Sequence, residues 1–159
     1  MTESDGTTIF CDDIRVELFN KATLIGMYGY ELVVFGKFPV TLPKLGIFLS
    51  LRFHREKKIN GAQVRVYFPG VFDESAAYIE NLPIKLDKDS FPMPDPVQYP
   101  DPGEFYGFNH PIMFSPAVIK EAGYIRVRAI AGGETIKCGS LRLREATSDE
   151  MPKAIPSSS

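Results

Sequence analysis

The dipeptide Gly132-Gly133 constrains the fold of this chain most, because it joins two apolar segments through only two residues. In the segment before it, Ile125 and Val127 alternate with Arg126, so one side is apolar and the other is charged. Residues 134–145 return with a similar mixture of apolar and charged side chains. A two-residue Gly-Gly turn between two such segments predicts a β-hairpin. Because an isolated hairpin is marginally stable in water, we expect a second sheet to cover its apolar face.

The last predicted strand, Thr135 to Arg144, changes its alternation between Cys138 and Leu141. This change predicts a β-bulge at Gly139-Ser140. The strand carries Lys and Arg but no proline, and we expect it to lie at the edge of a sheet. Such an edge can pair once with a second copy of the chain, although the long loop at 87–104 could instead cover it.

The remaining chain predicts further short strands and almost no helix. Residues 72–86 suit either one helical turn or an edge strand, and Asp12-Asp13 predicts a bend or bulge. The other predicted strands are residues 9–18, 22–35, 45–54, 63–68 and 105–114. About eight such strands predict an all-β, antiparallel two-sheet sandwich, immunoglobulin-like or a related Greek key, with a partly open barrel as the second choice.

A family resemblance is carried mainly by the first third of the chain. Its motifs are Cys11-Asp12-Asp13-Ile14-Arg15, Asn20-Lys21, Leu24 to Tyr28, Phe38-Pro39 and Leu42 to Leu45. They resemble an uncharacterised bacterial family, a domain of unknown function with an Asp-x-x-Arg start, an Asn-Gly-Lys turn and an Ile-Gly-x-aromatic strand. The glycine of that turn is missing here. The resemblance implies an all-β sandwich with no established activity, and it carries over no site residues.

The length of 159 residues fits one domain. We expect unstructured tails at residues 1–7 and 147–159 around a domain spanning 8–146. Residues 87–104 contain five prolines and five acidic residues, which predicts a long loop. The acidic side chains could collect calcium ligands, but their spacing fits no EF-hand, so a solvated loop is preferred. They are Asp87, Asp89, Asp95, Asp101 and Glu104.

The composition of the chain indicates which partners we do not expect to bind it and in which cellular compartment we expect it. A formal net charge of -2 argues against a nucleic-acid partner, and no apolar run is long enough to predict a membrane-spanning helix. The polar N-terminus lacks the pattern of a secretory signal, so we expect a cytoplasmic location. Cys11 and Cys138 predict two small buried thiols; a bridge between them would require neighbouring strands and an oxidising compartment.

No catalytic or cofactor site is predicted. His54 and His110 have no neighbouring ligands at metal-binding spacing. Cys11 is followed by Asp12 and Asp13, but it lies in a predicted strand, where nothing lowers the pKa of its thiol. We therefore expect a non-enzymatic protein without a cofactor.

Aromatic residues provide the candidate interface. The predicted exposed patch consists of Tyr99, Phe105, Tyr106, Phe108 and Leu141. It predicts a protein-interaction or structural module that forms a homodimer, unless the rings only pack the long loop onto the sheet edge. The alternative is a small-ligand or glycan binder, with Tyr99 or Tyr106 beside Asp101 and Gln98.

Overall fold

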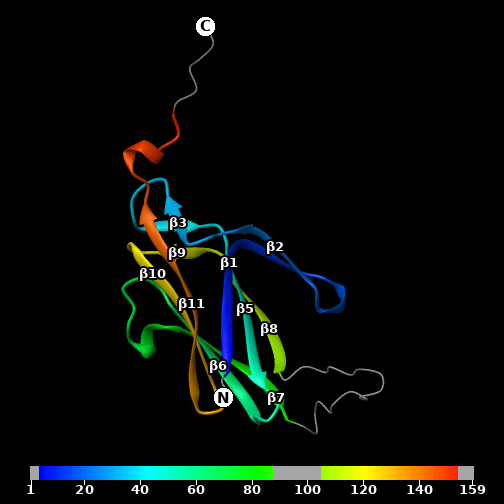
Figure 1. Cartoon of the computed structure of the whole chain (residues 1–159). Coiled ribbons are helices and arrows are strands. Elements are labelled where there is room, and N and C mark those ends of the chain that lie inside the picture. The colour runs from blue at the N-terminus through cyan, green and yellow to red at the C-terminus, as the bar shows by residue number, and fades with distance from the viewer. Residues whose placement is uncertain (1–3, 88–104, 154–159) are drawn as a thin grey trace.

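A computed structural model describes residues 4–87 and 105–153 as two packed β-sheets (Figure 1). The four-stranded sheet has the order β2 (Ala22–Met27), β1 (Asp5–Val16), β5 (Leu45–His54), β8 (Phe105–Phe114). The five-stranded sheet has the order β3 (Glu31–Val34), β11 (Glu134–Glu145), β10 (Gly123–Ala131), β6 (Ile59–Tyr67), β7 (Tyr78–Leu86). A small separate pair joins β4 (Val40–Leu42) to β9 (Ala117–Ile119). The predicted all-β sandwich of antiparallel sheets is confirmed, with one parallel pair between β11 and β3.

The core lies between the two sheets and follows from alternation along the strands. Every second residue of β5 is fully buried: Leu45, Ile47, Leu49, Leu51 and Phe53. The five-stranded sheet supplies the facing layer from β6, β10 and β11: Val64, Val66, Ile125, Val127, Ala129, Leu141 and Leu143. Each such side chain contributes about 1.5–3 kcal/mol on leaving water, apart from the smaller alanine. The packing of these two apolar faces is therefore what holds the sandwich together.

The predicted hairpin at Gly132-Gly133 is confirmed as the pair β10–β11. Both glycines have positive φ, 57° and 77°, as the two central positions of a type I′ turn require. The predicted bulge in β11 is also present. The pairing shifts opposite Val127 and Arg128, so Cys138 is the extra residue, one position before the predicted Gly139-Ser140.

Residues 4–87 and 105–153 contain eleven strands rather than the predicted eight. The segment 22–35 breaks at residues 28–30 into β2 and β3, which belong to different sheets. The proline-rich crossover at 38–43 contains β4, which pairs with β9. Both alternatives considered for 72–86 occur together, as a helical turn at Glu74–Ala76 followed by strand β7.

The predicted tails are too long. β1 begins at Asp5, where it pairs with Arg52 of β5, so part of the segment 1–7 is strand. Thr147 caps a short helical turn at Ser148–Glu150 inside the predicted C-terminal tail. The predicted loop at 87–104 lies outside the described residues except for Asp87.

The prediction that the last strand is a sheet edge is wrong. β11 lies between β10 and β3, and Arg142 to Glu145 pair in parallel with Glu31 to Val34. Before that point, β1 packs alongside β11, with Gly6 facing Cys138. The spacing of residues in a strand does not reveal a parallel partner that comes from a distant segment of the chain.

Both cysteines are buried and unbridged, as the first interpretation predicted. Cys138 lies against Gly6, whereas Cys11 lies against Gly46 on β5. Burial is the largest cause that raises the pKa of both thiols, and it brings the pKa of Cys138 to about 11. Both side chains are therefore protonated at neutral pH and pack as small apolar groups.

Candidate interaction surface at the β1–β2 arm

A two-stranded arm projects from the sandwich where β1 leaves the four-stranded sheet (Figure 1). The pairing of β1 with β5 ends at Cys11 and Gly46, while its pairing with β2 continues to Val16 and Ala22. Residues 12–27 thus pair mainly with each other, and we call them the arm. The β1–β2 pairs stay in register on both sides of Asp12-Asp13, so the predicted bulge is not present there. The chain instead bends away from β5 after Cys11, as the other alternative predicted (Figure 1).

Polar contacts fix the base of the arm. Gly26 has φ 65°, and a Cβ there would overlap the carboxylate of Asp12, which lies across it. The Tyr28 hydroxyl donates to Asp12; desolvation and this acidic partner together raise the pKa of Tyr28. On the other side of the bend, Lys44 pairs with Asp13 at 3.2 Å. The direction in which the arm leaves the body is therefore set by contacts at its root.

The tip of the arm holds a phenylalanine in a left-handed backbone conformation. Phe19 has φ 61° and ψ 38°, and Asn20 has φ 57°, which again makes a type I′ turn. Asn tolerates this conformation, but for a bulky residue it costs about 1–2 kcal/mol. The Phe19 side chain is 92% exposed, so burial in this chain does not offset that cost. Strain of this kind at an exposed side chain points to a role outside the isolated fold. The turn is centred one residue before the predicted Asn20-Lys21.

Apolar side chains continue from the tip along the arm. Val16 and Leu18 are exposed beside Phe19, and Ile25 and Met27 are exposed on β2. Just beyond β2, the side chain of Tyr30 is 95% exposed. Contiguous exposed apolar groups of this kind mark interaction sites more often than scattered single ones do.

Among the strands that the structure describes, none pairs with the outer edge of β2, and this edge lacks both charge and proline. From Ala22 to Tyr30 the chain contains no charged residue and no proline. The other outer strands of the two sheets have features that oppose pairing with a further strand. Pro83 and Lys85 lie in β7, Pro111 lies in β8, and β3 has only four residues. Because exposed edges recruit further strands unless they are blunted, β2 is the strand edge best suited to pairing.

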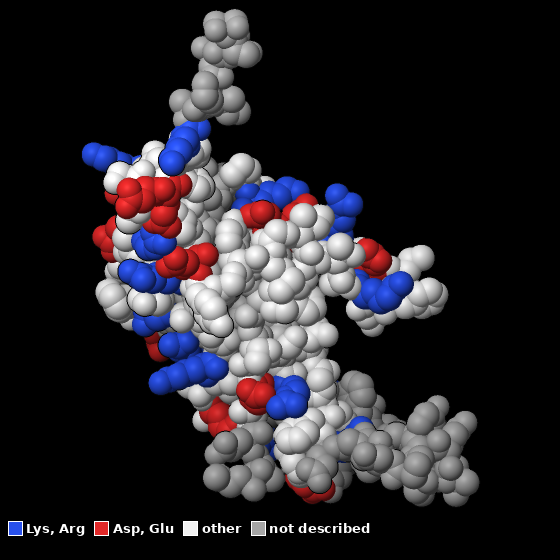
Figure 2. All heavy atoms as spheres, turned by 45° about the horizontal axis from the view of Figure 1, so that its top comes forward, with Lys and Arg blue, Asp and Glu red and all other residues white. Residues whose placement is uncertain are grey.

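The space beneath the arm has a mixed lining, in which Asn20, Lys21 and Asn109 accompany several apolar residues. A hollow of about 380 Å³ separates the arm from the outer face of the four-stranded sheet. Val16 and Ala22 line it from the arm, and Phe48 and Pro111 line it from the sheet. Figure 2 shows that the centre of the neighbouring face has almost no charged residues, whereas charges gather at its margins. The uncharged strand β2 therefore lies beside a surface whose centre has few charges, while the charged residues of the arm belong to residues 12–21.

The residues predicted from the sequence as an interface are not brought together. Leu141 is 0% exposed and lies in the core, so its assignment to a surface is wrong. Tyr106 is also buried, because alternation along β8 turns it inward opposite Phe53. Phe108 is half-buried against the core, and only Phe105 is exposed, at the start of β8. Tyr99 lies outside the described residues, as do Asp101 and Gln98 of the alternative ligand site.

The arm lies apart from the aromatic residues near the proline-rich loop, on which the predicted interface was based. The available signal was the run of uncharged residues from 22 to 30, preceded by Leu18 and Phe19 in a turn. Turn positions usually hold polar or glycine residues, so two large apolar residues in a turn indicate an exposed apolar site.

Other site classes find little support in the described part of the chain. Residues 4–87 and 105–153 contain no group of three His, Cys, Asp or Glu side chains placed to hold a metal ion. Within the same residues, no helix has the length and apolar character needed to cross a membrane.

Comparison with models of known protein families gives no match, and comparison with curated proteins gives none either. The resemblance to an uncharacterised bacterial family therefore stays a prediction.

Proposed function

We propose that this protein is a non-enzymatic interaction module that forms a homodimer through the arm. The observation that carries the proposal is the open, uncharged and proline-free edge of β2, next to the exposed side chains of Leu18 and Phe19. Backbone pairing along such an edge supplies hydrogen bonds, and the flanking side chains supply apolar contact. The two unbridged thiols fit the cytoplasmic location expected from the sequence.

A second copy of the chain is the partner that best fits the distribution of apolar side chains. Phe19 and Tyr30, both almost fully exposed, flank β2 on either side. If two β2 strands pair antiparallel about a twofold axis, with Ile25 of each copy opposite its counterpart, Asn20 of each copy is opposite Tyr30 of the other and Phe19 lies next to that position. A twofold contact of this kind is self-complementary, as homodimer interfaces are.

Mass in solution tests the association. Sedimentation equilibrium should show a dimer for the native chain, and Ile25→Lys should shift it to monomer, because charges on an edge strand oppose pairing. Val118→Lys is the matched control, since Val118 is exposed on β9, away from β2, and this variant should remain dimeric. A native monomer at high concentration would refute the dimer. A dimer unaffected by Ile25→Lys would show that the interface lies elsewhere.

Cross-linking tests the proposed register. In that register Ile25 of one copy is opposite Ile25 of the other, and directly opposed Cβ atoms lie about 4.5–5.5 Å apart. Mild oxidation of the Ile25→Cys chain should therefore give more covalent dimer than mild oxidation of the Leu24→Cys chain, in which the two cysteines are not directly opposed. Equal yields from the two variants would contradict this register. The native cysteines should contribute little, since both are buried.

A further inference from the structure

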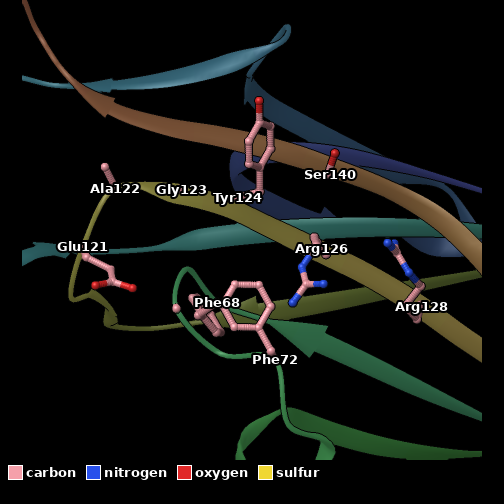
Figure 3. Close-up of a pocket in the computed structure, with 10 residues that line it drawn as sticks. Phe68, Phe72, Glu121, Ala122, Gly123, Tyr124, Arg126, Arg128 and Ser140 are labelled. Carbon is pink, nitrogen blue, oxygen red and sulfur yellow. The ribbon is translucent and has the colours of Figure 1, made fainter.

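A second hollow, of about 320 Å³, opens on the outer face of the five-stranded sheet (Figure 3). Its floor is β10, from which the side chains of Tyr124, Arg126 and Arg128 rise on the same side. The segment 68–72 and the turn 121–123 form its walls. This surface is separate from the arm, which belongs to the other sheet.

The guanidinium group of Arg126 is held in place before any ligand arrives. The rings of Tyr67 and Phe72 each lie 5.0 Å from it, in cation–π contact. Its Nη2 donates to the backbone oxygen of Val71 at 2.7 Å. An arginine has five N–H donors, so most of its hydrogen-bonding capacity is still available for a ligand. A planar group fixed in this way is suited to bind a carboxylate or a phosphate.

Arg128 adds a second positive charge without a matching acid. Its neighbours across the adjacent strands are Arg65 on β6 and Lys137 on β11, so three cationic side chains lie side by side. Arg65 pairs with Glu74, but no ion pair joins Arg126 or Arg128 to a carboxylate among the described residues. Because like charges on facing residues destabilise a sheet, an anion bound here would relieve repulsion.

Apolar side chains complete the hollow on its other side. Phe72 is 79% exposed, and the rings of Phe68 and Tyr124 also line the hollow. The one carboxylate in the lining belongs to Glu121, and it lies against Gly70. A bound anion would therefore place its negative group at the arginines and away from Glu121.

The geometry points to a binding site for a small aromatic anion, with its carboxylate or phosphate on Arg126 and Arg128 and its ring against Phe72. The volume suits a molecule with a single ring and one acidic group. The two arginines recognise the charge that carboxylates and phosphates share, and the exposed rings select for a flat apolar body.

NMR titration with benzoate and with phenyl phosphate tests this inference and distinguishes the two acidic groups. The arginine Nε–H signals of the intact chain should shift and saturate with a dissociation constant of roughly 1 mM for the better probe. Arg128→Gln should weaken binding at least about fivefold, because it removes a charge-assisted hydrogen bond. Arg126→Lys should also weaken it, since lysine keeps the charge but loses the planar fork. Arg52→Gln, on the other sheet, is the control and should bind normally.

Several outcomes would overturn the inference. The site is refuted if neither probe gives saturable shifts, or if both arginine variants bind as well as the native chain while keeping its melting temperature. If inorganic phosphate binds as tightly as phenyl phosphate, the selection for an aromatic body is wrong. Tighter binding of benzoate than of phenyl phosphate would assign the site to carboxylates, and the reverse order would assign it to phosphates.

Discussion

Gly6 of β1 lies so close to Cys138 of β11 that a Cβ added at position 6 would be only 2.6 Å from the cysteine Sγ. The same Cβ would be 3.0 Å from Leu51 and 3.2 Å from Ile136, both of which are buried. A hydrogen at this position is therefore what allows β1 to approach β11 and connect the two sheets. Cys138 is buried on the same side of β11 as Ile136, so its thiol faces this contact.

Gly6→Ala should lower the free energy of unfolding by about 1–3 kcal/mol, because the added methyl overpacks a tight contact. Removing the thiol should restore part of that loss, so the double variant Gly6→Ala/Cys138→Ala should lose less stability than the two single changes added together. Urea unfolding of the four proteins measures the coupling. Gly107→Ala is the control, since nothing lies within 4 Å of its added Cβ. Strictly additive losses would contradict the contact.

Stability should fall at alkaline pH because of Cys138. Burial raises the pKa of its thiol from 9.0 to about 11, so the folded state favours the protonated form. This contribution is complete below pH 9 and is lost as the pH rises towards 11, by up to roughly 2–3 kcal/mol. Other groups titrate in that range, so the test is the difference between the native chain and Cys138→Ala in urea unfolding from pH 8 to pH 11. A constant difference would show that the thiol does not cause the loss.

Stability should also fall in acid, through an ion-pair network centred on Arg144. The Arg144 guanidinium contacts Glu31 at 2.8 Å and Glu150 at 2.7 Å. Mainly through hydrogen bonds from Arg144, the pKa of Glu31 is lowered and that of Glu150 falls to about 2. Because the folded-state pKa values are depressed, the stabilisation is present above pH 4.5 and is lost as the pH falls towards 2.

Arg144→Gln should raise the pKa of Glu150 towards 4.5, as measured by NMR of its side-chain carboxyl carbon. Arg52→Gln, which breaks the exposed pair with Asp5, serves as the control and should leave the pKa of Glu150 unchanged. If the pKa of Glu150 stays low without Arg144, the hydrogen bonds from Thr147 would be its main cause.

Two glycine substitutions at the tip of the arm should separate folding from association. Phe19→Gly relieves a left-handed strain of about 1–2 kcal/mol, so the melting temperature should stay the same or rise. The same change removes the most exposed ring of the arm and should weaken dimerisation at least about tenfold, which is about 1.4 kcal/mol. Asn20→Gly is the matched control, because it changes the same turn but keeps the ring, and its dimer should resemble the native one. Lower stability of Phe19→Gly with unchanged association would mean that Phe19 serves only the fold.

Local sequence patterns were sufficient for much of the architecture. Gly132-Gly133 specified a type I′ hairpin because only glycine adopts two consecutive left-handed positions without cost. Strict alternation in Leu45–His54 specified a strand with one fully buried face, and the changed alternation after Cys138 specified a bulge. These features depend on residues close in sequence, so the chain alone determined them.

Pairing between strands that are far apart in the sequence decided the rest of the architecture. Leu24 and Val33 lie in one segment, 22–35, that resembles a single strand, yet they entered different sheets because β3 found a parallel partner in β11, more than a hundred residues away. That pairing gave the end of β11 a second neighbour, while Leu141, opposite Ile125 on β10, faces the core between the sheets. Likewise, the bend after Cys11 separated the arm from β5, and this left β2 as an exposed edge. Register between distant strands depends on how all the apolar faces are buried together, so only the tertiary structure could decide which edge and which rings remain exposed.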